Sequence, residues 1–242
     1  MPAFLRIALV AALMAAACRP SHRTLPAPAQ EAPTPWAQEI EAFERQDLER
    51  PFDKGGVVFV GSSSIRLWSS LQEDMDPVPV LNRGFGGSRL ADSVRYSDVL
   101  VGKHDPSLAV VFSGTNDLAG SDAKSADEVV ELFRLLVEAL RASDADLPIV
   151  YIAITPTLAR EQHIETVRDA NRRIRAVCDA DERLEFIDPT ADLADADGRP
   201  DARYFRADRL HLNEAGYAIW TDHIRPVVQG LYEREQRSTV QR

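Results

Sequence analysis

Cysteine is nearly absent from this chain of 242 residues, which contains only Cys18 and Cys178. Cys18 directly follows an apolar N-terminal segment, so Cys178 alone remains in the part of the chain that is expected to fold. An intramolecular disulfide in that part is therefore excluded. Cys178 lies in step with Ile164, Val167 and Ile174 on a predicted helical face, and we expect it to be a buried packing residue.

Positive charge is also scarce, because 28 Lys and Arg residues against 38 Asp and Glu residues give a formal net charge of −10. Binding to nucleic acid needs clustered Lys and Arg residues that neutralise phosphates, and this chain does not show them, so we expect no nucleic-acid partner. A Walker loop and sets of His, Cys and carboxylate residues with metal-ligand spacing are missing too. The sequence therefore predicts no metal site and no cofactor.

A long apolar run is missing as well. Arg6 precedes an apolar stretch over residues 7–17, which is too short to span a bilayer comfortably and ends in small residues. This is the pattern of a secretory signal peptide. It predicts a signal peptide over residues 1–18 and an exported protein.

The segment Leu13–Ala17 (LMAAA) before Cys18 resembles the lipobox of bacterial lipoproteins, in which the cysteine is acylated. This chain departs from the usual pattern at Ala15, where leucine is customary. The resemblance implies lipidation of Cys18, which would anchor the protein to a membrane of the bacterial cell envelope without a transmembrane helix. The alternative is plain cleavage and release into the periplasm. We expect contact with a membrane only through this N-terminal anchor.

Residues 19–35 contain five prolines and hardly any large apolar side chain, so they predict an extended tether. The rest of the chain is long enough to bury one substantial core. We expect a single domain over residues 36–235 and a disordered tail over residues 236–242.

Short apolar runs alternate with longer segments of helical period from residue 57 onward. Each run is almost continuously hydrophobic, as expected of a strand that is buried on both faces of a parallel sheet. Such an alternation predicts an α/β fold, a three-layer α/β/α sandwich around a five-stranded parallel sheet, with ligands bound outside the carboxyl ends of the strands. The runs are Val57–Val60, Val78–Leu81, Leu108–Phe112, Ile149–Ile154 and Leu184–Ile187.

Four segments predict the longer helices. Ser125 and Glu128 have the spacing of a capping box at the start of one helix, and residues 160–179 repeat the amphipathic pattern. Asn213 is a candidate N-cap of a last helix that Pro226 should kink or split. Trp36–Leu48 predicts an additional helix before the first strand.

Asp208 lies three residues before His211 near the end of the chain, which sets an acid beside a candidate general base. A base of this kind needs a nucleophile, and Gly61–Ser64 (GSSS) supplies a cluster of hydroxyls directly after the first predicted strand. A hydroxyl, an imidazole and an orienting acid indicate a serine hydrolase, and all three serines are chemically suitable. The Gly-x-Ser-x-Gly elbow of α/β-hydrolases is incomplete, because Ile65 occupies its second glycine position.

Four segments taken together resemble the SGNH or GDSL-type hydrolase family of esterases and lipases, over about residues 55–230. The resemblance implies a flavodoxin-like SGNH hydrolase fold. Each segment is weak evidence alone, but their order along the chain is specific. The segments are Gly61–Ser64 (GSSS), Asn82–Ser88 (NRGFGGS), Gly114–Asp117 (GTND) and Asp208–His211 (DRLH).

The resemblance also implies a role for individual residues. It places the nucleophile at Ser63, the general base at His211 and the orienting acid at Asp208. It places an oxyanion hole at the backbone N–H groups of Ser63 and Gly87 and the side-chain amide of Asn116. This chain departs from the family at Ser62, where aspartate is more usual, and that aspartate is not the triad acid.

We therefore expect a serine esterase that hydrolyses carboxylic esters through an acyl-enzyme and needs no cofactor. The family includes enzymes for acetyl and short-acyl esters of sugars and for lysophospholipid-type lipids, and the sequence does not choose among these small-molecule, glycan and lipid esters. Two alternatives stay open. One is an acyltransferase that uses the same residues, and the other is a non-catalytic lipoprotein that uses the fold for binding at the cell envelope.

Overall fold

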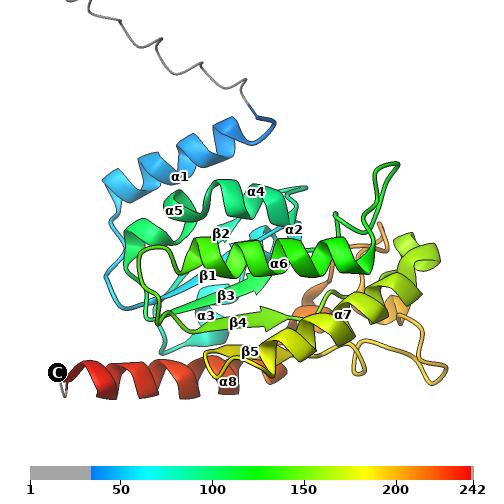
Figure 1. Cartoon of the computed structure of the whole chain (residues 1–242). Helices are drawn as coiled ribbons and strands as arrows, with labels where there is room; N and C mark the ends of the chain where they lie inside the picture. Colours follow the sequence, from blue (N-terminus) through cyan, green and yellow to red (C-terminus); the bar gives the residue numbers. More distant parts are fainter. Residues whose placement is uncertain (1–33, 241–242) are drawn as a thin grey trace, which may run out of the picture. The chain divides into compact units, whose positions relative to one another are not determined.

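The structure is a computed structural model that describes residues 34–240 (Figure 1). The predicted signal peptide and Cys18 lie outside the described residues, and so does the predicted tether except for its last two residues. No helix within residues 34–240 combines the length and the apolar character needed to cross a membrane.

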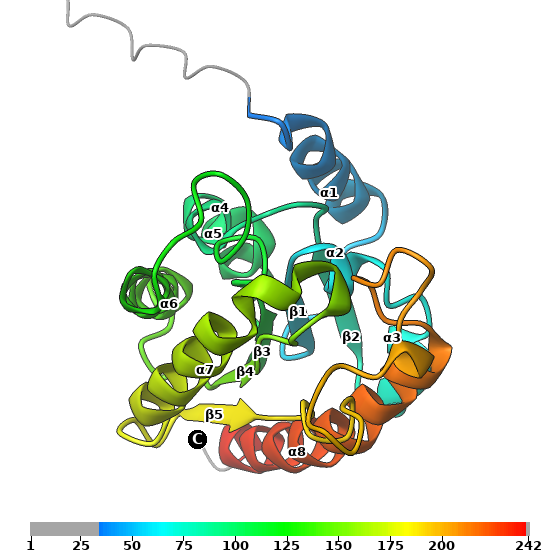
Figure 2. The ribbon, with the colours of Figure 1, turned by 90° about the vertical axis from the view of Figure 1, so that its right-hand side faces the viewer.

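Five parallel strands form one sheet in the order β2-β1-β3-β4-β5. Gly61, the last residue of β1, lies beside Gly84 of β2 and Phe112 of β3, so these three strands end at the same edge. Figure 2 looks onto that edge. The predicted five-stranded parallel sheet is confirmed. The strands are β1 (Val57–Gly61), β2 (Val80–Gly84), β3 (Leu108–Phe112), β4 (Ile149–Ile152) and β5 (Leu184–Ile187).

Four predicted strand boundaries differ from the structure. β1 ends at Gly61, one residue past the predicted Val60, and β2 ends at Gly84, three residues past the predicted Leu81. β2 begins at Val80 and not at Val78, because the amide of Val78 donates to the carbonyl of Met75 (2.9 Å) and belongs to the preceding turn. β4 ends at Ile152, two residues before the end of the predicted run. A continuous apolar run therefore locates a strand but does not fix its ends.

Helices cover both faces of the sheet and form the predicted three layers (Figure 2). Val58 and Val60 of β1 point into one core, while Val57 and Phe59 point into the other. The first core is covered by α1 (Ala37–Glu49), α4 (Leu90–Arg95), α5 (Ser97–Leu100), α6 (Ala126–Leu140) and α7 (Ile164–Cys178), and the second by α2 (Ser63–Arg66), α3 (Leu71–Met75) and α8 (Glu214–Val240). Short 3₁₀ helices are η1 (Gly102–His104), η2 (Leu158–His163) and η3 (Ala202–Tyr204).

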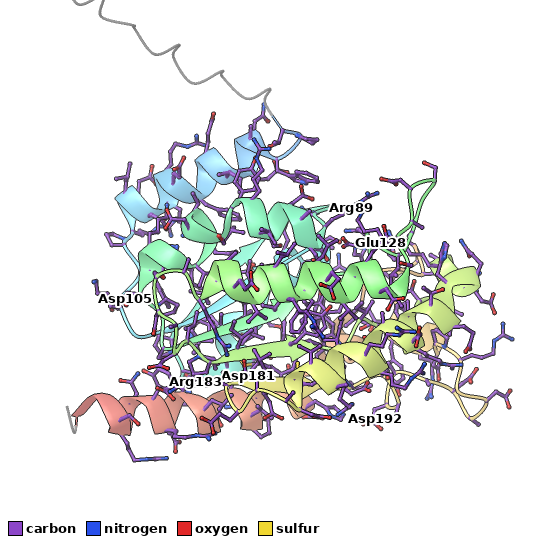
Figure 3. All side chains as sticks on the ribbon, viewed as in Figure 1. Arg89, Asp105, Glu128, Asp181, Arg183 and Asp192 are labelled. Carbon is purple, nitrogen blue, oxygen red and sulfur yellow. The ribbon has the colours of Figure 1, made fainter. Side chains whose placement is uncertain are left out.

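The predicted start of α6 is confirmed. The hydroxyl of Ser125 accepts from the amide of Glu128 (3.3 Å), and the Glu128 carboxylate accepts from the amide of Ser125 (2.8 Å). Figure 3 labels Glu128 at this end of the helix. Cys178 at the end of α7 is buried as predicted, and burial raises the pKa of its thiol to about 12, which makes it a poor nucleophile.

The last helix is longer than predicted. The side chain of Asn213 caps it as expected, accepting from the amide of Gly216 (3.1 Å). α8 then runs through Pro226 as one helix and continues to Val240, so Pro226 does not split it, and residues 236–240 are helical where a disordered tail was predicted. The side chain of Gln236 donates to the carbonyl of Gly55 (3.2 Å), a contact with the domain that local sequence cannot reveal.

Helix α1 is fixed to the sheet by a buried ion pair. Arg83 of β2 is fully buried, and its guanidinium pairs with Asp47 and donates to the side chain of Gln46 (2.9 Å). Lys103 lies 2.8 Å from the second oxygen of Asp47, and the Arg83 guanidinium packs over the ring of Phe43. Because a buried charge is costly unless it is paired, these contacts hold α1 firmly against the domain.

Candidate active site

The structure brings the serine cluster and the last motif together at the carboxyl edge of the sheet. The Oγ atom of Ser63 lies 2.8 Å from Nε2 of His211, although the two residues are 148 positions apart. Nδ1 of His211 lies 2.7 Å from Oδ2 of Asp208. Hydroxyl, imidazole and carboxylate thus form one continuous relay, the arrangement that activates a serine for nucleophilic attack.

Local turns hold the imidazole. Oδ1 of Asp208 accepts from the amides of Leu210 and His211 (2.9 Å each), which leaves Oδ2 for the ring. Desolvation acts to raise the pKa of Asp208, but the bonds from the ring and the two amides outweigh it and lower that pKa to about 2. Asp208 is therefore ionised at neutral pH and can hold a proton on Nδ1, which leaves Nε2 free to accept from Ser63.

The nucleophile candidate lies at the strand-to-helix transition that follows β1. Ser63 is the first residue of α2, and the amide of Ser62 donates to the carbonyl of Phe112 (3.1 Å). A Cβ at Gly84 would lie 2.2 Å from the amide nitrogen of Arg66, so only glycine allows the end of β2 to approach α2 so closely. Within the described residues, Ser63 is the one member of the serine cluster whose hydroxyl is bonded to a histidine.

Asn116 lies in the same narrow cavity as Ser63 and His211. Its Nδ2 donates one hydrogen to the carbonyl of Ser88 (2.9 Å), which leaves the second hydrogen available to a substrate oxygen. Gly87 precedes Ser88 and has a φ of 76°, a conformation that favours glycine. The loop of the second motif and the loop of the third are therefore joined directly beside the nucleophile candidate.

Arg160 also lines this cavity, and sequence analysis missed it. Its guanidinium donates to Oδ1 of Asn116 (2.9 Å) and to the carbonyl of Thr115 (2.5 Å). Burial lowers the pKa of Arg160. A cation bonded to the carbonyl end of an amide polarises its N–H groups, so Arg160 both orients Asn116 and makes it a stronger donor. Arg160 lies in η2, where no periodic pattern distinguishes it from a surface arginine.

Asp117, the last residue of the third motif, is fully buried and accepts from the amide of Leu90 (3.1 Å) at the start of α4. Desolvation raises its pKa to about 6; the Leu90 amide and Arg89 oppose this rise, and Asp92 adds to it. Figure 3 labels Arg89 at this end of α4. A raised pKa in the folded state stabilises the protein below the ordinary value of 3.8, and this contribution is lost as the pH rises through about 6.

We therefore expect the wild-type protein to lose up to about 3 kcal/mol of unfolding free energy relative to D117N between pH 4 and pH 8. The asparagine can still accept the Leu90 amide bond but does not titrate. Urea unfolding of both proteins at the two pH values measures the difference. If the difference in unfolding free energy between the wild type and D117N were the same at pH 4 and pH 8, the raised pKa of Asp117 would be contradicted.

Among the described residues, no group of three or more His, Cys, Asp or Glu side chains is arranged to hold a metal ion. The chemistry that the cavity offers is that of the serine, the imidazole, the carboxylate and the surrounding N–H donors.

The model of the GDSL-like Lipase/Acylhydrolase family matches residues 56–219. No curated protein matches the chain.

Solved structures share the fold at low sequence identity. A Streptococcus pneumonia protein provisionally described as a platelet activating factor is 20% identical, covers 79% of this chain and 92% of its own, and gives a TM-score of 0.69. A GDSL-like lipase from Bacteroides thetaiotaomicron is 18% identical, with 79% and 98% covered and a TM-score of 0.66. A carbohydrate esterase family 3 protein from Talaromyces cellulolyticus is 17% identical, with 74% and 99% covered and a TM-score of 0.60.

The family match spans all four motif segments, and the neighbours share the sheet architecture that brings these segments to one edge. The chain is therefore a hydrolase of the SGNH or GDSL type, a member of the GDSL-like lipase/acylhydrolase family.

Proposed function

We propose that this protein is a serine esterase that cleaves carboxylic esters through an acyl-enzyme. The observation that carries the proposal is the relay from Ser63 through His211 to Asp208 inside a cavity that also holds Asn116. A binding protein has no use for a nucleophile, a base, an acid and a neutral N–H donor in one place. The non-catalytic alternative is therefore the weaker one.

The geometry suggests the sequence of steps. His211 takes the hydroxyl proton as the Ser63 oxygen attacks the ester carbonyl, and Asp208 stabilises the imidazolium. The imidazolium then protonates the leaving alkoxide as the C–O bond breaks, which leaves an acyl group on Ser63. Water, deprotonated by His211, then attacks the acyl carbon. The imidazolium returns this proton to the Ser63 oxygen as the acyl C–O bond breaks, which releases the acid and restores the serine. The N–H groups of Ser63, Gly87 and Asn116 bind the oxyanion formed in both steps.

We propose a short acyl group as the preferred substrate. The cavity around Ser63 is narrow, and Phe112 and Trp220 form part of its wall, which leaves little room for a long chain. Thr115, Thr155 and Thr157 also line the cavity, and this polar lining suits a small, polar ester better than a long hydrocarbon chain. Acetyl and other short-acyl esters of sugars therefore fit the cavity better than esters of long fatty acids.

A panel of p-nitrophenyl esters from acetyl to palmitoyl, assayed with protein that lacks the first 33 residues, tests this proposal. We expect the highest kcat/KM for acetyl to butyryl esters and a steep fall beyond octanoyl. Added sugar or lipid alcohols separate hydrolysis from acyl transfer, because only a transferase forms a new ester. If the protein hydrolysed no ester of the panel while circular dichroism showed an intact fold, the esterase proposal would be wrong.

We also propose export and lipid attachment at Cys18, which rest on the sequence alone. Expression of the full chain in a bacterial host, followed by mass spectrometry of the mature N-terminus, tests both. The expected product begins at a diacylated Cys18, whereas an unmodified N-terminus would indicate plain cleavage.

Asn116→Ala should lower kcat by about 10²- to 10³-fold with little change in KM, because the lost N–H acts in the transition state. Arg160→Gln should lower kcat by about 10-fold, since it releases the Asn116 side chain. If Arg160 acts through Asn116, the double variant will be no slower than N116A. Steady-state kinetics on all three variants checks this, and additive losses would show that Arg160 contacts the substrate itself.

A further inference from the structure

The loop between β2 and α4 carries the proposed oxyanion donor Gly87, and one of its contacts comes from far outside the four motifs. Within the loop, the hydroxyl of Ser88 donates to the carbonyl of Phe85 (3.0 Å). The carbonyl of Gly86 instead accepts from the indole N–H of Trp36, at 2.6 Å. Trp36 directly precedes α1 and lies outside the segment that matches the family model.

The hydrogen bond from Trp36 fixes the orientation of the whole Gly86–Gly87 peptide group. The carbonyl of Gly86 and the N–H of Gly87 belong to one planar trans peptide group, so they point in opposite directions and rotate together. A bond that fixes the carbonyl therefore also fixes the N–H. Two consecutive glycines restrict the rotation of this group very little. A Cβ at Gly87 would meet no atom within 4 Å, so no neighbouring group packs against that side of the residue.

The two ends of the glycine pair are already tied to the nucleophile segment. The amide of Phe85 donates to the carbonyl of Gly61 (3.0 Å), and the Ser88 hydroxyl, whose single hydrogen is shared with the carbonyl of Phe85, lies 3.3 Å from the same Gly61 oxygen. Gly61 lies two residues before Ser63. The loop is thus placed beside the catalytic serine by its ends, while the direction of its central peptide depends on the contact with Trp36.

Contacts with the rest of the domain fix the position of the Trp36 side chain. Its ring packs edge-on against Phe85, with centroids 6.0 Å apart. Two residues earlier, the hydroxyl of Thr34 lies 2.5 Å from that of Tyr96, a contact that does not involve the indole. At the other end of α1, the ion pair of Asp47 with Arg83 holds the helix on the sheet. The indole N–H is therefore presented to the loop from a fixed position.

We propose that Trp36 is a positioning residue for ester hydrolysis. Its N–H holds the Gly86–Gly87 peptide so that the amide of Gly87 points into the oxyanion hole. The inference rests on the proposed esterase function and adds to it a structural requirement: the N-terminal helix completes the active site. A truncation that starts at the first strand would contain all four motifs and still lack this contact.

Trp36→Phe tests the proposal, because it removes the N–H and keeps a ring against Phe85. We expect kcat to fall by about 10-fold with KM within about 2-fold of the wild type. Affinity for a trifluoromethyl ketone, which forms a tetrahedral oxyanion with the serine, should fall by the same factor. Tyr96→Phe is the matched control, since it removes the partner of Thr34 but leaves the Gly86 bond, and we expect less than a 2-fold change.

Selective ¹⁵N-glycine labelling gives a readout that does not depend on turnover. The amide order parameter of Gly87 should drop in W36F and not in Y96F. If W36F does not fold, benzothienylalanine at position 36, which keeps the indole shape without the N–H, makes the same test.

Unchanged kcat in W36F, an equal loss in Y96F or a rise in KM alone would each overturn the positioning role. Wild-type protein without esterase activity would remove the proposed function and this inference with it. Active wild-type protein beside an equally active W36F would remove this inference alone.

Discussion

Ser63→Ala is expected to lower kcat for a short-chain ester by about 10⁴- to 10⁶-fold, the largest effect of any single substitution in this chain. The reason is geometric. Ser63 is the residue whose hydroxyl lies 2.8 Å from Nε2 of His211, so its removal leaves the base without a nucleophile to activate. KM should change little, because the hydroxyl contributes almost nothing to ground-state binding. Single-turnover kinetics on purified protein measures the loss.

The neighbouring serine provides a matched control. Ser64 lines the same cavity and differs from Ser63 by one position along α2. Ser64→Ala should keep kcat within about 5-fold of the wild type, because no bond between its hydroxyl and His211 is present in the described structure. If S64A were inactive and S63A retained activity, the nucleophile would be Ser64 and the relay as drawn would be wrong.

Asp208→Asn is expected to lower kcat by about 10³- to 10⁴-fold. The two carboxylate oxygens of Asp208 have different partners. Oδ1 accepts hydrogen bonds from two backbone amides, and Oδ2 faces the imidazole of His211. An asparagine that keeps its oxygen on the amides must turn its NH₂ group toward Nδ1 of His211. That donor forces the ring proton onto Nε2, where the ring can no longer accept the proton of Ser63. Far-ultraviolet circular dichroism should be unchanged, because the turn around Asp208 is preserved.

The chain contains a second exposed acid–imidazole pair that serves as the control. Oδ2 of Asp192 lies 2.6 Å from Nε2 of His223 on α8. Asp192→Asn should change kcat by less than about 2-fold, since in the described part of the chain this pair has no hydroxyl beside it. A D208N variant that retained more than a tenth of wild-type kcat would show that His211 is oriented by other contacts.

The sheet and the relay could be predicted because their signals are local and strong. Strands buried on both faces read as continuous apolar runs, and β3 and β5 begin and end where the runs do. The parallel sheet then brings the segments after β1 and β3 to one edge. Ser63 and Asn116 therefore line one cavity.

Other features depend on contacts that no local pattern encodes. Helices α2 to α5 have four to six residues, too few for an amphipathic period to be recognised. The last residues of α8 contact the domain through Gln236, whose partner Gly55 is 181 positions away. Arg160 and Trp36 each donate a hydrogen bond to a motif residue from a segment that carries no motif. Sequence analysis thus found the proposed reacting groups and the carboxylate of Asp208, but it missed the contacts of Trp36 with Gly86 and of Arg160 with Asn116.

The most direct test of the central claim is labelling with a fluorophosphonate probe, followed by peptide mass spectrometry. Such a probe reacts quickly only with an activated serine, whichever ester the enzyme uses in the cell. We expect a single adduct on Ser63 in the wild-type protein and at least a 100-fold slower reaction in His211→Ala, on the order expected when the general base is lost. An adduct on Ser62 or Ser64, or labelling that is equally fast without His211, would contradict the account.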